Sequence, residues 1–126
     1  MTALYLWVNA VIYGVFAILC TIRADATSKS IGFLSLNNGG MAEYVTVYGG
    51  MELGLGIIFA WLAYRPELHR TGIVLALALY APLVIFRWIS VARYGPVQAL
   101  TLGTGALETT LLILAIALWL TQRNAV

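Results

Sequence analysis

The sequence predicts an all-α integral membrane protein, a bundle of four transmembrane helices. Hydrophobic residues make up 62% of the 126-residue chain and charged residues 10%, whereas soluble domains are about half apolar and a quarter charged. The apolar residues form four runs, and a helix needs roughly 20 such residues to cross about 30 Å of hydrocarbon. Because only short polar segments separate the runs, we expect a single four-helix transmembrane domain over residues 1–126.

The first apolar run predicts a helix over about residues 3–22. It ends at Arg23, which together with Asp25 and Lys29 cannot cheaply enter hydrocarbon. Residues 23–41 are polar and rich in glycine and asparagine, so we expect the long loop of the protein there.

The remaining runs predict helices over about residues 42–64, 72–92 and 98–120. Arg65-Pro66 ends the second run, because proline and charge stop a helix and hold a turn in water. A Tyr94-Gly95-Pro96 turn separates the third run from the fourth. Four spans place both termini on one side of the membrane.

Three ionisable side chains interrupt the apolar runs: Glu52, Arg87 and Glu108. Each costs about 2.5 to 3.5 kcal/mol at the centre of a bilayer, so a compensating interaction is expected. With a rise of about 1.5 Å per residue, all three lie roughly 5 to 12 Å from the helix ends that border the long loop. The three charges are therefore expected in the same half of the membrane, close enough to compensate one another.

Helical periodicity adds tyrosines to the faces that carry these charges. Tyr48 lies one turn before Glu52, Tyr80 lies two turns before Arg87, and Tyr13 belongs to a weakly polar stripe on the first helix. Turning these faces inward would bury the polar groups and leave Leu, Ile and Val to lipid. The candidate ligand-binding residues are thus Tyr13, Tyr48, Glu52, Tyr80, Arg87 and Glu108, and no residue is assigned a catalytic role.

The charges of the three side chains do not cancel. If Arg87 pairs with one glutamate, the negative charge of the other must be compensated by a proton, a bound cation or a ligand group. The alternative is a polar clasp that fixes helix register and binds nothing, since polar contacts hold transmembrane helices together by about 0.6 to 2 kcal/mol each. Intramembrane ionisable residues are generally functional, which favours a ligand or proton site.

Other features of the sequence are less informative. The seven basic residues are too scattered for a nucleic-acid surface. His69 is alone in a charged turn, so we expect it to be solvated or interfacial, and neither a metal site nor a cofactor is expected. Gly50 and Gly54 form a small-xxx-small pair that predicts close helix packing inside the bundle or in a homodimer.

Several segments together resemble a family of small membrane proteins, the domain of unknown function 4345. They are Glu43-Tyr44, the run Val47–Gly54 with its Tyr-Gly-Gly core, the run Phe86–Ser90 followed by Tyr94-Gly95, and Glu108. The resemblance implies four helices and the cytoplasmic (inner) membrane of a bacterium, and it brings no reaction. The family's tyrosine-glycine pair, arginine and last-helix glutamate correspond to Tyr48, Gly49, Arg87 and Glu108, whereas Glu52 rests on the physical argument alone.

The function that these residues favour is binding of a small amphipathic or lipid-like molecule in a polar intramembrane cavity. Arg87 and a glutamate would hold the headgroup, and the tail would lie between apolar helix faces. A proton-coupled small transporter is an alternative, although small multidrug exporters carry a glutamate in their first helix where this chain has Asn9. An isomerase that uses two carboxylates and an accessory subunit of a membrane complex are further alternatives. The expected partners are membrane lipid, this ligand, and a second copy or a larger membrane complex.

Overall fold

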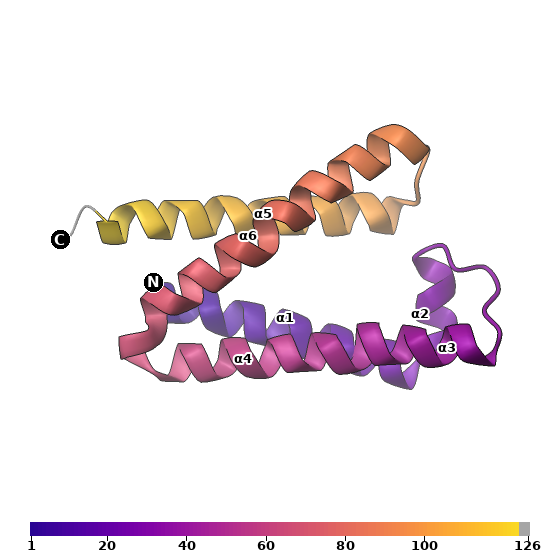
Figure 1. Cartoon of the computed structure of the whole chain (residues 1–126), viewed down its shortest axis with the longest axis horizontal. Coiled ribbons are helices and arrows are strands. Elements are labelled where there is room, and N and C mark those ends of the chain that lie inside the picture. Colours follow the sequence, from indigo (N-terminus) through magenta and orange to yellow (C-terminus); the bar gives the residue numbers. More distant parts are fainter. Residues whose placement is uncertain (124–126) are drawn as a thin grey trace.

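The computed structural model describes residues 1–123, and these form an all-α bundle without strands (Figure 1). Four helical segments are long and apolar enough to cross a membrane. They are α1 (Thr2–Ile22), the continuous run of α3 (Asn38–Tyr44), η1 (Val45–Met51) and α4 (Glu52–Tyr64), then α5 (His69–Tyr94) preceded by the short η2 (Pro66–Leu68), and α6 (Ala99–Arg123). The predicted fold class is confirmed.

The second span begins earlier than the apolar run that predicted it. Asn37 is extended and its side chain accepts a hydrogen bond of 2.8 Å from the backbone N–H of Gly40. This N-cap satisfies a free donor of the first turn, so the helix starts at Asn38 and not near residue 42. Hydrophobicity alone does not mark such a start, because the first turn, Asn38-Gly39-Gly40, is polar and flexible.

The segment expected as a long loop contains a further helix, α2 (Ala24–Ser30). Lys29 pairs with Asp25 at 2.8 Å one turn away. The hydroxyl oxygen of Tyr44 lies within hydrogen-bond distance of Thr27 Oγ1, at 3.0 Å, and of Cys20 Sγ, at 3.3 Å, which ties α2 to α1 and α3. Local hydrogen bonds thus fold part of the connection back beside the second span.

The spans are arranged as two helix pairs. In Figure 1, α1 lies alongside α4, and α5 begins beside this pair and crosses α6 at an angle. Gly56 permits the first pairing, since a Cβ there would lie 3.2 Å from the backbone nitrogen of Gly14 and 3.3 Å from the carbonyl oxygen of Ala10. The Gly50 and Gly54 pair expected to pack inside the bundle faces open space instead, so that prediction was wrong for the interior.

The core lies where the two pairs meet, toward the end that holds both termini. Tyr80 donates to Asn9 Oδ1 at 2.5 Å, and Tyr5 donates to the carbonyl oxygen of Leu111 at 2.9 Å. The surrounding buried side chains are Leu6, Tyr13, Phe59, Leu62, Ile73, Ala76 and Ala115. Toward the other end the pairs diverge, and α2 stands beside the opening between them (Figure 1).

A turn of charged residues joins α4 to α5. Arg65 Nε lies 3.2 Å from Glu67 Oε1, and both side chains are more than half exposed. His69 Nε2 is 3.1 Å from the carbonyl oxygen of Ala63, one of the carbonyls left free at the end of α4. His69 therefore contributes to the helix end.

Candidate functional site

The centre of the candidate site is an ion pair between α5 and α6. Arg87 Nε lies 2.5 Å from Glu108 Oε2, and Arg87 Nη2 lies 2.6 Å from Glu108 Oε1. The two parallel bonds match the planar fork of the guanidinium to both carboxylate oxygens. The side chains are 26% and 11% exposed, so the pair is largely shielded. Arg87 on the third span thus pairs with Glu108, the glutamate of the last helix.

A glycine makes room for this ion pair. Gly105 precedes Glu108 by three residues, and a Cβ at Gly105 would lie 2.9 Å from Arg87 Cδ. The aliphatic part of the arginine therefore lies against the bare backbone of α6, and its guanidinium reaches the next turn.

Glu52 does not join the ion pair. It is half-buried at the start of α4, and among residues 1–123 it has no hydrogen-bond or ion-pair partner. The charged group that acts on it is Glu108, which has the same sign. The three predicted charges therefore form one neutral pair and one separate carboxyl group, not a closed three-way clasp.

Glu52 follows the π-helical stretch η1, in which the wider turn changes the direction of the side chains. Gly49 in this stretch approaches α1 so closely that a Cβ would lie 2.5 Å from Thr21 Oγ1. π-Helical turns often occur at functional sites. The Gly49-Gly50 pair is the one sequence signal that could have indicated an irregular turn here.

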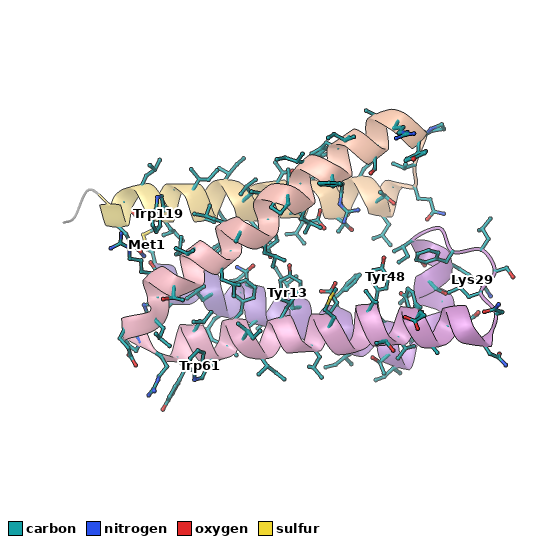
Figure 2. All side chains as sticks on the ribbon, viewed as in Figure 1. Met1, Tyr13, Lys29, Tyr48, Trp61 and Trp119 are labelled. Atoms are coloured by element: carbon teal, nitrogen blue, oxygen red, sulfur yellow. The ribbon has the colours of Figure 1, made fainter. Side chains whose placement is uncertain are left out.

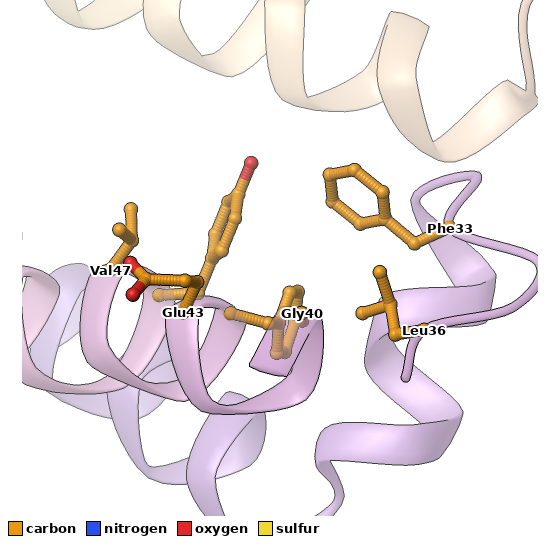
Figure 3. A pocket seen from close by; sticks show the side chains of 7 residues that line it. Phe33, Leu36, Gly40, Glu43 and Val47 are labelled. Atoms are coloured by element: carbon orange, nitrogen blue, oxygen red, sulfur yellow. The ribbon is translucent and has the colours of Figure 1, made fainter. Parts of the chain in front are cut away.

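Tyr48 lies on the side of the α1–α4 pair that faces α5 and α6 (Figure 2). Its ring stacks on Tyr44 at a centroid distance of 4.7 Å and meets the edge of Phe33 at 6.3 Å. These rings border a shallow hollow of about 210 Å³ whose other walls are Leu36, Gly40, Glu43 and Val47. Figure 3 shows Phe33 and Leu36 reaching across from the loop toward the helix that carries Glu43 and Val47. The hollow is almost wholly apolar and lies apart from the ion pair.

Tyr13 and Tyr80 belong to the core. Tyr13 stacks on Phe59 at 5.7 Å and on Tyr80 at 6.5 Å, and both tyrosines are at least nine-tenths buried. The hydroxyl of Tyr80 is already bonded to Asn9. Tyr13 is within electrostatic range of both glutamates. These two predicted site residues thus form the packed layer next to the ion pair and do not line an open space.

The open space lies on the other side of Arg87. A groove-like cavity of about 430 Å³ runs along α5 near the start of α6 and Ile31 at the end of α2. It is open on its outer side, where Phe86 and Tyr94 are 71% and 68% exposed. Its walls are mostly apolar, and Arg87, Ser90, Tyr94 and Thr101 supply the polar groups. The remaining lining residues are Ile31, Leu83, Phe86, Val91 and Val97. Sequence reasoning missed Thr101, although its spacing of seven residues from Glu108 places both on one face of α6.

The fold and site define a multi-pass helical membrane protein with an intramembrane ion pair beside a mostly apolar cavity. The chain belongs to the family described as domain of unknown function (DUF4345), whose sequence profile matches residues 2–120. The expected family membership is therefore confirmed. The comparisons found no significant match among curated proteins or among solved structures.

The structure gives a physical meaning to the residues that carried the resemblance. Arg87 and Glu108 are the two halves of the ion pair, and Gly49 is the close contact between η1 and α1. Ser90, in the same run as Arg87, lines the cavity. Some of the residues of α5 and α6 that carry the family resemblance are therefore also residues of the candidate site.

Proposed function

We propose that this protein binds a small amphipathic, lipid-like molecule within the membrane. The headgroup lies at Arg87, and the tail lies among the apolar side chains of α5 and the end of α2. The observation that carries the proposal is that Arg87, held by Glu108, lines the wall of a mostly apolar cavity. The volume of about 430 Å³ falls within the range of roughly 300 to 1,000 Å³ that is typical of ligand sites.

The position of the ion pair supports binding over a purely structural clasp. A clasp needs only the two side chains and is best enclosed by packed neighbours, because water or lipid near the pair adds nothing to its stability. Here Glu108 holds one side of the guanidinium, and the cavity leaves another side of Arg87 open. A few directed polar groups in a mostly apolar wall are typical of a site that orients a ligand.

Native mass spectrometry of detergent-purified protein tests the proposal. The wild type should retain a small molecule that Arg87→Leu loses, while the variant stays folded by circular dichroism. Arg65→Leu is the matched control, because it makes the same chemical change in an exposed pair of the α4–α5 turn. Retention of the same molecule by Arg87→Leu, or carriage of bulk phospholipid alone by every protein, would contradict the proposal.

Proton-coupled transport is a second candidate function, and Glu52 is the observation that favours it. A half-buried carboxyl group without a partner in a membrane-spanning segment can take up and release a proton. Uptake of a cationic dye driven by a proton gradient should then be abolished by Glu52→Gln and unchanged by Glu67→Gln in the exposed turn. Equal uptake in wild type and Glu52→Gln would exclude this role for Glu52.

We further infer that the surrounding membrane is the cytoplasmic membrane of a bacterium, as the family resemblance implies. The open face of Gly50 and Gly54 supports a homodimer, because a second helix could approach closely there. Crosslinking of single cysteines introduced at these two positions in native membranes would test the dimer.

A further inference from the structure

The polar groups around the cavity restrict the chemistry of the ligand that the proposed function requires. We propose that the headgroup is uncharged and presents a hydrogen-bond-accepting oxygen, such as an ester or ketone carbonyl, to Arg87, Ser90 and Thr101. This inference rests on the proposed function and names the ligand class of the same site.

The cavity offers donors that have no partner in the protein. A guanidinium has five N–H groups, and Glu108 accepts from Nε and Nη2 of Arg87. The hydroxyls of Ser90 and Thr101 make no hydrogen bond within residues 1–123, although both residues line the cavity.

The other threonines of α6 behave differently. Thr104, Thr109 and Thr110 each donate to the backbone carbonyl four residues earlier, at 2.7 to 2.9 Å. Such bonds are the usual way in which a helix satisfies a hydroxyl in an apolar environment. Thr101 lies in the first turn of α6, where the residue four positions earlier precedes the helix, and Ser90 is exposed. Both hydroxyls are therefore accessible to a ligand in the cavity.

Charge balance argues against an anionic headgroup. The charge of Arg87 is already matched by Glu108 through both carboxylate oxygens. An anion at Arg87 would add an unmatched negative charge close to Glu108, which pairs with the same guanidinium. An unmatched charge in the hydrocarbon region is costly.

A cationic headgroup fits the cavity no better. Its only cationic wall residue is Arg87, which repels a second cation, and Glu52 is not among the residues that line it. Glu108 is not among these lining residues either. An uncharged acceptor is the one headgroup that meets the free donors and leaves the charge of the site unchanged.

Three probes with the same ten-carbon chain distinguish the headgroups: methyl decanoate, decanesulfonate and decyltrimethylammonium. Saturable binding to the purified wild type is measured by native mass spectrometry over a concentration series. We expect methyl decanoate to bind at least about tenfold more tightly than either permanently charged probe. Placing an unmatched charge in hydrocarbon costs more free energy than a tenfold difference in affinity represents.

Two sets of variants test the mechanism of this preference. Glu108→Gln leaves the charge of Arg87 unmatched, so the preference should change from methyl decanoate to decanesulfonate. Ser90→Ala should weaken methyl decanoate binding several-fold, and Ser90→Thr should restore it by returning the hydroxyl. If Glu108→Gln does not fold, the wild-type ranking and the Ser90 pair decide the question.

The outcomes separate this inference from the proposed function. Tighter binding of a charged probe, lost in Arg87→Leu, would overturn the uncharged headgroup and leave the binding function standing. Equal binding of all three probes would overturn the inference in the same way. Saturable binding of none of them to folded wild type would overturn both.

Discussion

Removing the Arg87–Glu108 pair one partner at a time should destabilise the protein more than removing both. Leaving one member of a buried ion pair alone costs about 3 to 5 kcal/mol, whereas replacing both by apolar residues is often neutral. The pair here is 26% and 11% exposed, so we expect the lower end of that range, about 3 kcal/mol, for Glu108→Leu.

The two single substitutions should differ in size. In Arg87→Leu the remaining carboxyl can neutralise itself by taking up a proton, and we expect a loss of only about 1 to 2 kcal/mol. In Glu108→Leu the guanidinium cannot lose its charge. The double variant Arg87→Leu/Glu108→Leu should lie within about 1 kcal/mol of wild type, which gives a coupling energy of about 4 to 5 kcal/mol.

Unfolding in mixed micelles with increasing dodecyl sulfate measures the free energies of unfolding of the wild type, the two single variants and the double variant. The same proteins are then examined for bound small molecules. A double variant that is stable and empty would show that the pair is needed for the ligand and not for the fold. The reasoning is refuted if the double variant is as unstable as Glu108→Leu, or if the two single variants lose equal stability.

Three further predictions concern packing and the helix ends. Gly56→Ala should destabilise the α1–α4 contact by about 1 to 2 kcal/mol because backbone atoms face the new Cβ, whereas Gly54→Ala, which meets open space, should be neutral or slightly stabilising in the same unfolding assay. Tyr80→Phe should cost about 1 to 3 kcal/mol, because it leaves the fully buried Asn9 Oδ1 without a donor; an unchanged unfolding midpoint would contradict this. Asn37→Ala should increase hydrogen exchange in the first turn of α3, since it removes the N-cap worth about 1 kcal/mol, and Asn38→Ala is its control.

The sequence was sufficient to predict the spans because the bilayer imposes a length on every apolar run. It was also sufficient to single out Arg87 and Glu108, since charged residues are rare in membrane helices and must be compensated. Periodicity could not decide which glutamate Arg87 contacts. That choice depends on the close approach of α5 to α6 at Gly105, and interhelical distance is not encoded in the pattern of a single helix.

The tyrosines and glycines show a second limit of sequence reasoning. Tyr80 was predicted on the helix face of Arg87 and Tyr13 on a weakly polar stripe of the first helix, but the tight contact of the two helix pairs at that level places both in packed core. Gly50 and Gly54 match a packing motif, yet the contacts are made by Gly49 and Gly56. The π-helical turns of η1 shift the face that α4 presents to α1, and a projection with 3.6 residues per turn misses this shift.

The cavity follows from the way in which the two helix pairs are joined. The short turn between α4 and α5 and the Tyr80–Asn9 bond hold the pairs together near the termini, and the angle of α5 separates them toward α2 (Figure 1). Because Arg87 lies along α5 between the packed Tyr80 and the cavity-lining Tyr94, it stands where the core gives way to open space. A neutral ion pair is suited to this boundary, since it satisfies the core on one side without presenting a net charge to the other, and it keeps spare donors for a ligand. The ion pair and the cavity should therefore respond to different substitutions. Replacing Arg87 or Glu108 affects the ion pair, whereas replacing a residue that holds α5 away from α2 affects the cavity.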